Sequence, residues 1–416
     1  MTARERIGGN RRFLAGRQRS AVSSLRGFPL PRKLGLFAAS ILAASVLAPA
    51  SAVLAAARTS SAGQCTTWVT TASRNVGTGD NQLEAVTAVS SGSVWAVGQY
   101  FVGANTRTLI EHWNGKTWKV VTSPSPGSVN SLNAVYAASA ANIWAVGGYA
   151  TGASASHTLI EHWNGKSWKV VKSPDPGAGT NALSGVRGTS ARDVWAVGYT
   201  EIGYPRFNTL VLHWNGKTWK VVKSANGDSQ SNQLTAVRPL SPSSAWAAGW
   251  YTKGSANRSL IERWSKGRWR VVYSPNGSNS TNELEGILAT SATSAWATGW
   301  DYNPAVHADR TLLLHWNGTR WKHAYSPNAG AGSNDLFAIG GTSAANVYAV
   351  GSYLTSTGGN VLILHWNGSH WRVMAGRNPD QNNSLSAVFA LSPASIWAVG
   401  STSNSGTSRT LIEHCK

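Results

Sequence analysis

The sequence predicts an all-β fold, a seven-bladed β-propeller with four antiparallel strands in each blade, from three observations. First, the His-Trp pair of residues 112–113 returns, once as Arg-Trp, with steps of 50, 51, 50, 52 and 50 residues, and a fixed period indicates a tandem array. Second, Trp, Gly, Ser, Thr and Val are abundant while helix formers are scarce, which favours strands and turns. Third, the core of a short apolar strand recurs once per unit, with its aromatic residue at Trp95, Trp144, Trp195, Trp246, Trp296, Tyr348 and Trp397.

One repeat unit shows the four strands, which we name a to d in chain order. In the second unit they are predicted at residues 132–138, 142–147, 158–163 and 168–172. Asn164-Gly165 lies between strands c and d and is a strong hairpin signal, because both residues tolerate positive φ. Four strands in about 50 residues describe one propeller blade, which buries its faces only against its neighbours.

The repeats define the domain organisation. The predicted blades span residues 83–123, 132–173, 183–224, 234–274, 284–326, 336–375, and 385–416 together with 65–72. Nineteen of the 21 Trp residues fall on three repeated positions, in strand b, at the end of strand c and at the start of strand d. Aromatic residues at matched positions predict packing between blades, where each buried ring contributes ~2–3 kcal/mol to stability.

The two ends of the repeat array predict how the ring closes. Residues 411–416 read as a strand c with no strand d after it, while residues 65–70 align with residues 115–120 at the start of strand d. The last blade is therefore predicted to take strand d from the N-terminal side, which protects the open sheet edges. Cys65 and Cys415 would face each other in this blade, and we expect a disulfide between them. Unpaired thiols are the alternative.

The first 57 residues predict an export leader, followed by the propeller in residues 58–416. An Arg-rich segment precedes an apolar run at residues 34–47 and then small residues, which is the order of a secretory signal peptide. We therefore expect a secreted, extracellular protein without stable membrane insertion after cleavage, and an uncleaved anchor is the alternative. The leader holds nine Lys/Arg and one Glu, so +8 of the formal charge of +20 belongs to it.

The remaining charge and the histidines exclude several classes of ligand. The propeller's positive charge is spread through the repeats as single residues, so no nucleic-acid partner is expected. The repeated histidines fall on separate blades, whereas a metal needs several ligands around one point, so no metal and no other cofactor is expected. The Asn two positions before each strand-a Leu is expected to bind nearby backbone in a turn. We also expect a monomer.

The turn between strands c and d resembles the Asp-box repeat of bacterial-neuraminidase-like propellers, whose pattern is Ser-x-Asp-x-Gly-x-Thr-Trp. Gly115, Thr117 and Trp118 match its last three fixed positions, whereas Trp113 and Glu111 replace the Asp and the Ser. The resemblance extends through all blades and implies a secreted bacterial seven-bladed propeller with degenerate repeats. The arginine triad, the Tyr-Glu pair and the Asp acid/base of sialidases have no counterparts that we can place, so sialidase activity is not implied.

The variable loops predict a binding face. Turns a–b and c–d are short and repetitive and share one face, whereas the b–c and d–a loops vary in length on the other face. Exposed aromatic rings beside polar groups suit sugars, and blades three to five are rich in them. The alternative is that these rings pack the loops onto the blades. The candidate ligand-binding residues are Tyr199, Tyr204, Arg206, Trp250, Tyr251, Trp300, Asp301 and Tyr302.

Three functions remain open at this point. The sequence favours a non-catalytic binding propeller that recognises a glycan or a cell-envelope polymer. An enzyme such as a glycoside hydrolase or lyase would need two carboxylates about 5–10 Å apart, and no motif pairs those on the variable face. The third function is a scaffold that binds another protein. The carboxylates available to an enzyme are Asp175, Glu201, Asp228, Asp301 and Asp309.

Overall fold

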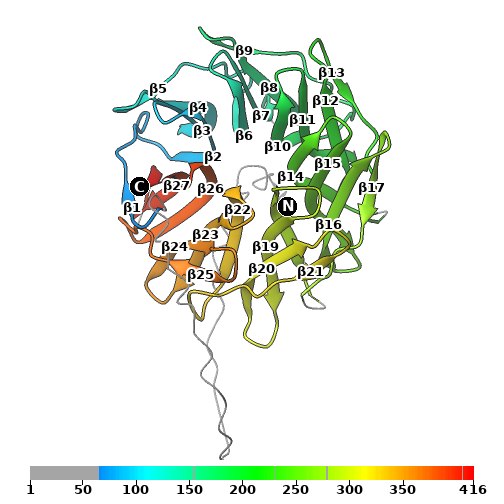
Figure 1. The fold of residues 1–416 in the computed structure, drawn as a ribbon. Coiled ribbons are helices and arrows are strands. Elements are labelled where there is room, and N and C mark those ends of the chain that lie inside the picture. Colours follow the sequence, from blue (N-terminus) through cyan, green and yellow to red (C-terminus); the bar gives the residue numbers. More distant parts are fainter. Residues whose placement is uncertain (1–64, 153–154, 229, 278–279, 405) are drawn as a thin grey trace, which may run out of the picture. The chain divides into compact units, whose positions relative to one another are not determined.

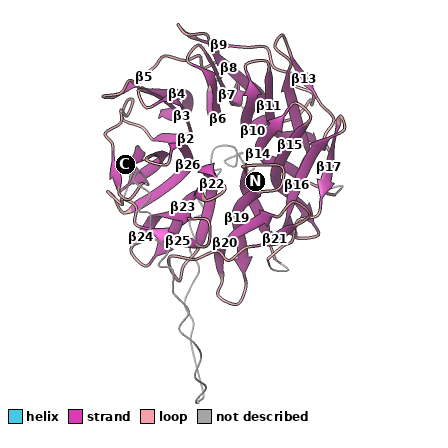
Figure 2. Cartoon of the chain, in the orientation of Figure 1, coloured by secondary structure: helices cyan, strands magenta, loops and turns pink. Residues whose placement is uncertain are grey.

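The computed structural model describes residues 65–416 except 153–154, 229, 278–279 and 405, and it confirms the predicted fold class. The described strands form seven four-stranded antiparallel sheets around a central channel (Figure 1). Figure 2 shows that strands and loops make up the whole described part. These residues belong to one compact unit, Thr59–Lys416. The predicted leader lies outside the described residues.

The strands occupy the four predicted positions in each blade. The strands in position a, which line the channel, are β2 (Asn81–Ser90), β6 (Val129–Ser139), β10 (Asn181–Ser190), β14 (Asn232–Ser241), β18 (Asn282–Ala289), β22 (Asn334–Ser343) and β26 (Asn382–Ser392). Those in position b are β3 (Ser93–Val102), β7 (Asn142–Ala150), β11 (Asp193–Gly203), β15 (Ser244–Lys253), β19 (Ala295–Asn303), β23 (Asn346–Thr355) and β27 (Ser395–Ser403).

The outer half of each blade holds positions c and d. Position c contains β4 (Asn105–Trp113), β8 (His157–Trp163), β12 (Arg206–Trp214), β16 (Ala256–Ser265), β20 (Ala308–Trp316), β24 (Gly358–Trp366) and β28 (Ser408–Cys415). Position d contains β5 (Trp118–Val120), β9 (Trp168–Val170), β13 (Trp219–Val221), β17 (Arg268–Val272), β21 (Trp321–His323), β25 (Trp371–Met374) and β1 (Trp68–Thr70). No described segment forms a helix that could cross a membrane.

The core lies between neighbouring blades, as the repeated Trp positions predict. Trp144 of strand b in blade two contacts two indoles of blade three, Trp214 with a centroid distance of 4.9 Å and Trp219 at 5.3 Å. Each of the seven blade interfaces contains one such apolar cluster. A Gly in strand b allows close contact with strand a: an ideal Cβ on Gly198 would lie 2.0 Å from the carbonyl oxygen of Ala182.

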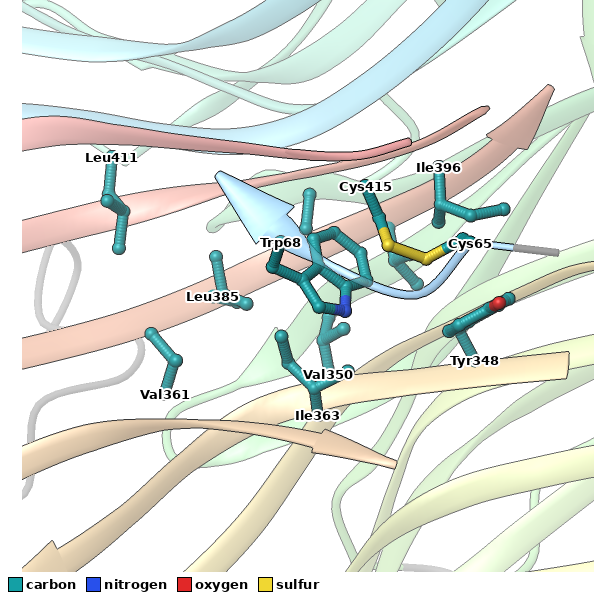
Figure 3. Packing of buried hydrophobic residues seen from close by; sticks show 12 residues of the cluster. Cys65, Trp68, Tyr348, Val350, Val361, Ile363, Leu385, Ile396, Leu411 and Cys415 are labelled. Carbon is teal, nitrogen blue, oxygen red and sulfur yellow. A yellow bond between two sulfur atoms is a disulfide. The ribbon is translucent and has the colours of Figure 1, made fainter. Parts of the chain in front are cut away.

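The predicted closure of the ring is confirmed. Strand β1 pairs with β28 in the last blade, with Trp68 opposite Cys415. Cys65 and Cys415 form a disulfide with a Cα–Cα distance of 5.4 Å, although 350 residues separate them in the chain. Figure 3 shows this bond beside Trp68. Val350 and Ile363 of blade six belong to the same apolar cluster. The first and last strands of the propeller thus share one core.

The repeated Asn residues act within turns. The Asn114 Oδ1 accepts the N–H groups of Lys116 and Thr117 at 3.0 Å each, and Gly115 adopts a φ of +93° in this c–d turn. At the start of strand a, Asn81 Oδ1 accepts the N–H of Val76 at 2.8 Å, and its Nδ2 donates to the carbonyl of Gly79. These bonds support the structural interpretation of both Asn positions.

Candidate functional site

Of the eight predicted residues, Trp300 is buried, Tyr199, Trp250, Tyr251, Asp301 and Tyr302 are half-buried, and Tyr204 and Arg206 are exposed. The Trp300 side chain is only 8% exposed, so the expectation of an exposed ring at this position is corrected. Tyr199 lies edge-on against Phe207 with a centroid distance of 5.2 Å, and burial raises the pKa of its hydroxyl to about 12. Both residues follow the strand-b Gly and pair with strands a and c of their blade.

Two more of the predicted residues contact glycines of the d–a linkers. An ideal Cβ on Gly227 would lie 2.6 Å from the Tyr251 ring, and one on Gly277 would lie 2.8 Å from Asp301 Oδ2. Burial raises the pKa of Asp301, and the neighbouring Asp309 adds to this effect, while His323 and Arg310 oppose it. Tyr251 and Asp301 therefore hold linkers against their blades, which is the packing alternative.

The other four predicted residues retain exposed surface. Tyr204 is 79% exposed and Arg206 is also exposed, at the tip of the b–c loop of blade three. Trp250 and Tyr302 are half-buried, and the Tyr302 hydroxyl lies 3.3 Å from Nδ1 of His307. We call Tyr204 and Arg206 the loop pair. Among the eight predicted residues, the loop pair is therefore the exposed part.

The backbone beneath the loop pair is anchored to the next blade. The carbonyl oxygen of Pro205 accepts a hydrogen bond from the Ser231 hydroxyl at 2.9 Å. Ser231 belongs to the linker that leads into blade four. This hydrogen bond connects the loop tip to the linker before blade four.

The carboxylates of the variable face hold loops in place. Asp175 pairs with the His157 ring and also accepts the N–H of Thr158 at 3.2 Å. Glu201 accepts the N–H of Thr180 at 3.0 Å. Asp301 and Asp309 lie on the neighbouring strands β19 and β20 of blade five and influence each other electrostatically. Within the described part of the chain, no group of three His, Cys, Asp or Glu residues is arranged to hold a metal ion.

A cavity of about 660 Å³ opens in the channel near the a–b turns, on the opposite face. Three of its lining residues occupy the same position in their blades, six residues after the strand-a Asn. They are Tyr136, Arg187 and Arg238 in blades two to four. Backbone and hydroxyl groups from the ends of strands a complete its wall, at Thr189, Thr290, Ser291, Thr342 and Ser343.

The two guanidinium groups are held differently. The Arg187 Cζ lies 5.7 Å from the ring centroid of Tyr136 and 5.5 Å from that of Phe389. Phe389 belongs to blade seven, so the Arg187 side chain reaches across the channel. The Arg238 Nε donates to the carbonyl of Ala289 at 3.3 Å.

The charges in the cavity are not balanced by acids. Neither Arg187 nor Arg238 forms an ion pair with a carboxylate of the described residues, and Arg187 donates no hydrogen bond to them. Burial, reinforced by Arg238, lowers the pKa of Arg187 to about 9, and burial also lowers the pKa of Arg238. Burial raises the pKa of Tyr136, so its hydroxyl remains a donor at neutral pH.

This cavity was not predicted from the sequence. The long loops were the expected binding region, whereas Arg187 and Arg238 lie inside regular strands. A signal was present: the corresponding residues of the other blades are uncharged, namely Thr87, Tyr136, Leu288, Gly340 and Phe389. The two arginines on consecutive blades depart from this pattern, and this departure is the sequence signal for the cavity.

Comparison with known proteins supports the class, a β-propeller, and no more. No protein-family model and no curated protein matches the chain. The structure of YCF48 bound to a D1 peptide is 13% identical, with a TM-score of 0.50 over 84% of this chain and 96% of the other. An ulvan lyase of polysaccharide lyase family PL25, bound to -[GlcA(1-4)Rha3S]-, is 10% identical, with a TM-score of 0.50 over 80% and 94%. YCF48 from Cyanidioschyzon merolae is 12% identical, with a TM-score of 0.49 over 84% and 98%.

Proposed function

We propose that the protein is a secreted, non-catalytic binding propeller that recognises an extracellular glycan or cell-envelope polymer through the face of the b–c and d–a loops. The observation that carries the proposal is the loop pair: Tyr204 is 79% exposed on a loop that Ser231 anchors through the Pro205 carbonyl. Fixing a loop before binding reduces the entropy that binding must overcome.

The chemistry of the loop pair suits a sugar polymer. The face of a tyrosine ring stacks on the apolar face of a pyranose, while its hydroxyl bonds to the sugar's hydroxyls. The adjacent Arg206 supplies up to five N–H donors for hydroxyl or acidic groups on the same chain. The half-buried Trp250 of the next blade extends the apolar surface available to a longer ligand.

The buried disulfide supports export. Disulfides persist in oxidising compartments and are rare in the cytosol. Cys65 and Cys415 are 2% and 0% exposed, and their bond joins the two ends of the propeller. This supports the secretory role expected for residues 1–57.

We propose a non-catalytic role because the carboxylates on this face are engaged in other contacts. Asp175, Glu201 and Asp301 are engaged in fixing loops, and they belong to different blades or linkers. Among the structurally similar propellers, one has a peptide bound and another is a polysaccharide lyase, so the fold itself favours neither binding nor chemistry.

The test is a polysaccharide pull-down and glycan array with the mature protein and the Tyr204→Ala/Arg206→Ala variant. We expect the variant to bind at least about tenfold more weakly, because it loses a stacking ring and a charged donor. Lys217→Ala is the control, since Lys217 is exposed in the c–d turn of blade three, on the opposite face. Unchanged glycan binding by the double variant would refute the loop-pair site.

An enzyme acting on polysaccharides is the second candidate. It is favoured by Asp301, whose pKa is raised by burial and by Asp309 on the neighbouring strand. Depolymerisation of a bound polysaccharide that disappears in Asp301→Asn would support the enzyme over the binding protein. If no glycan binds and a protein is instead captured through the loop pair, the scaffold function replaces both.

A further inference from the structure

We propose that the channel cavity is a second binding site, specific for an oxyanion (a carboxylate, sulfate or phosphate group), which Arg187 and Arg238 hold together. It lies near the a–b turns, on the face opposite the loop pair, and it is independent of the function proposed above.

The first argument is the unbalanced charge. Two arginines on neighbouring strands, β10 and β14, line one cavity, and neither forms an ion pair with a carboxylate in the described part of the chain. Removing a cation from water is unfavourable unless an opposite charge replaces the lost hydration. An anion bound between the two guanidinium groups would supply that charge.

The second argument is the count of available donors. A guanidinium has five N–H donors in a fixed planar arrangement that matches the oxygens of carboxylate, sulfate and phosphate. Arg238 uses one donor, to the Ala289 carbonyl, and Arg187 uses none within the described residues. Both arginines line a cavity that Thr189, Ser291 and Thr342 also line.

The third argument is that Arg187 is oriented before any ligand arrives. Its guanidinium lies between the rings of Tyr136 and Phe389, at 5.7 and 5.5 Å from their centroids. Cation–π contact with two rings restricts the side chain without using its N–H donors. Gly188 makes room for the Tyr136 ring, since an ideal Cβ there would lie 2.6 Å from Tyr136 Cε1.

The size of the cavity limits the ligand. Its volume of about 660 Å³ falls within the ~300–1,000 Å³ range of small-molecule sites. The space admits a body the size of a sugar behind the anionic group. A free oxyanion, an acidic sugar and the charged end of a polymer therefore share the required chemistry.

The test uses the mature protein and three sodium salts, glucuronate, sulfate and phosphate, at constant ionic strength with sodium chloride. Isothermal titration calorimetry and the ligand-dependent shift in melting temperature measure binding, and glucose is the uncharged control. We expect saturable binding of at least one oxyanion and none of glucose. Strongest binding of glucuronate indicates a uronic acid, and strongest binding of sulfate or phosphate indicates the inorganic ion or its ester.

The decisive variant is Arg187→Gln/Arg238→Gln, which should bind at least about tenfold more weakly, because charge-assisted hydrogen bonds are lost. Arg192→Gln is the control: it removes the same charge from the exposed a–b turn of blade three. If the double variant does not fold, Arg187→Lys keeps the charge without the planar donors and should still weaken binding.

Two results would overturn the proposal: no saturable binding of any of the three anions to the wild type, or equal affinity in wild type and whichever arginine variant folds. A purely structural Arg187 would change the melting temperature without ligand but not the shift that the anion produces. Tyr204→Ala/Arg206→Ala should retain anion binding, so failure of the loop-pair site and failure of this site are distinguishable.

Discussion

Blade two and blade four differ at one buried polar contact. Glu161 of β8 and Glu262 of β16 occupy the same strand-c position, and both are 0% exposed. The Glu262 Oε2 accepts the N–H of Ala225 at 3.2 Å, whereas neither carboxyl oxygen of Glu161 has a hydrogen-bond partner among the described residues. The difference arises in the preceding linker, where blade two has Pro124 in place of Ala225, and proline has no N–H.

In the other blades, too, the strand-c residue matches the linker residue that faces it. Glu111 accepts the N–H of Arg74 at 3.3 Å, and Glu413 accepts that of Arg377 at 3.1 Å. In the remaining three blades the linker residue is proline and the strand-c residue is leucine, at Pro174 with Leu212, Pro275 with Leu314, and Pro327 with Leu364. Thus a buried acceptor occurs where the linker offers a donor, and blade two alone combines the acceptor with proline.

The largest expected effect is the loss of the hydrogen bond in blade four, where Glu262 Oε2 is bonded and Oε1 has no hydrogen-bond partner among the described residues. Glu262→Leu removes the acceptor and leaves the Ala225 N–H without its bond, so we expect the free energy of unfolding to fall by ~1–3 kcal/mol. Urea denaturation of the wild type and the variant measures this difference. An increase in stability would contradict the comparison between the two blades.

The same change in blade two should have the opposite sign. Glu161→Leu removes a carboxyl without hydrogen-bond partners and creates the Pro-Leu combination found in three other blades. We expect the free energy of unfolding to rise by ~1–2 kcal/mol, since an unpaired buried polar group is unfavourable. Denaturation beside Glu262→Leu provides the matched control, and destabilisation of both variants alike would show that Pro124 is irrelevant.

The pH dependence tests the charge state of Glu161 rather than the contrast between the blades, because burial raises the pKa of Glu262 to about 8 as well. Burial raises the pKa of Glu161 to about 8, from 4.5 for an unperturbed Glu. The unfolded chain releases this proton as the pH passes 4.5, while the folded chain keeps it until about pH 8, so the wild type loses stability across that interval. The advantage of Glu161→Leu should therefore grow from pH 5 to pH 8, as melting temperatures of both proteins would show. A constant difference would exclude titration of Glu161 as the cause.

The smallest expected effect is restoration of the missing donor. Pro124→Ala supplies an N–H opposite Glu161, and the new bond should contribute ~1 kcal/mol. The greater freedom of the unfolded chain after loss of proline opposes this gain. A double-mutant cycle of Pro124→Ala with Glu161→Leu isolates the bond, and a coupling energy near zero would show that it does not form.

Much of the fold followed from local and periodic features. The Asn-Gly turn needs only its own backbone, and the repeated Trp positions recur with the period of the blades, so both are readable without coordinates. The closure was also readable, because a strand c without strand d at one end and an unpaired strand d at the other admit one pairing, which Cys65 and Cys415 confirm.

Only the tertiary structure decided which side chains meet across the ring. Trp300 and Tyr204 read alike in the sequence, yet one is 8% and the other 79% exposed, because neighbouring strands cover the first and a loop tip presents the second. Arg187 meets Phe389 from a distant blade only once the ring has closed. The period of a sequence determines repeated contacts within and between neighbouring blades, whereas the channel brings together the positions at which the repeats differ.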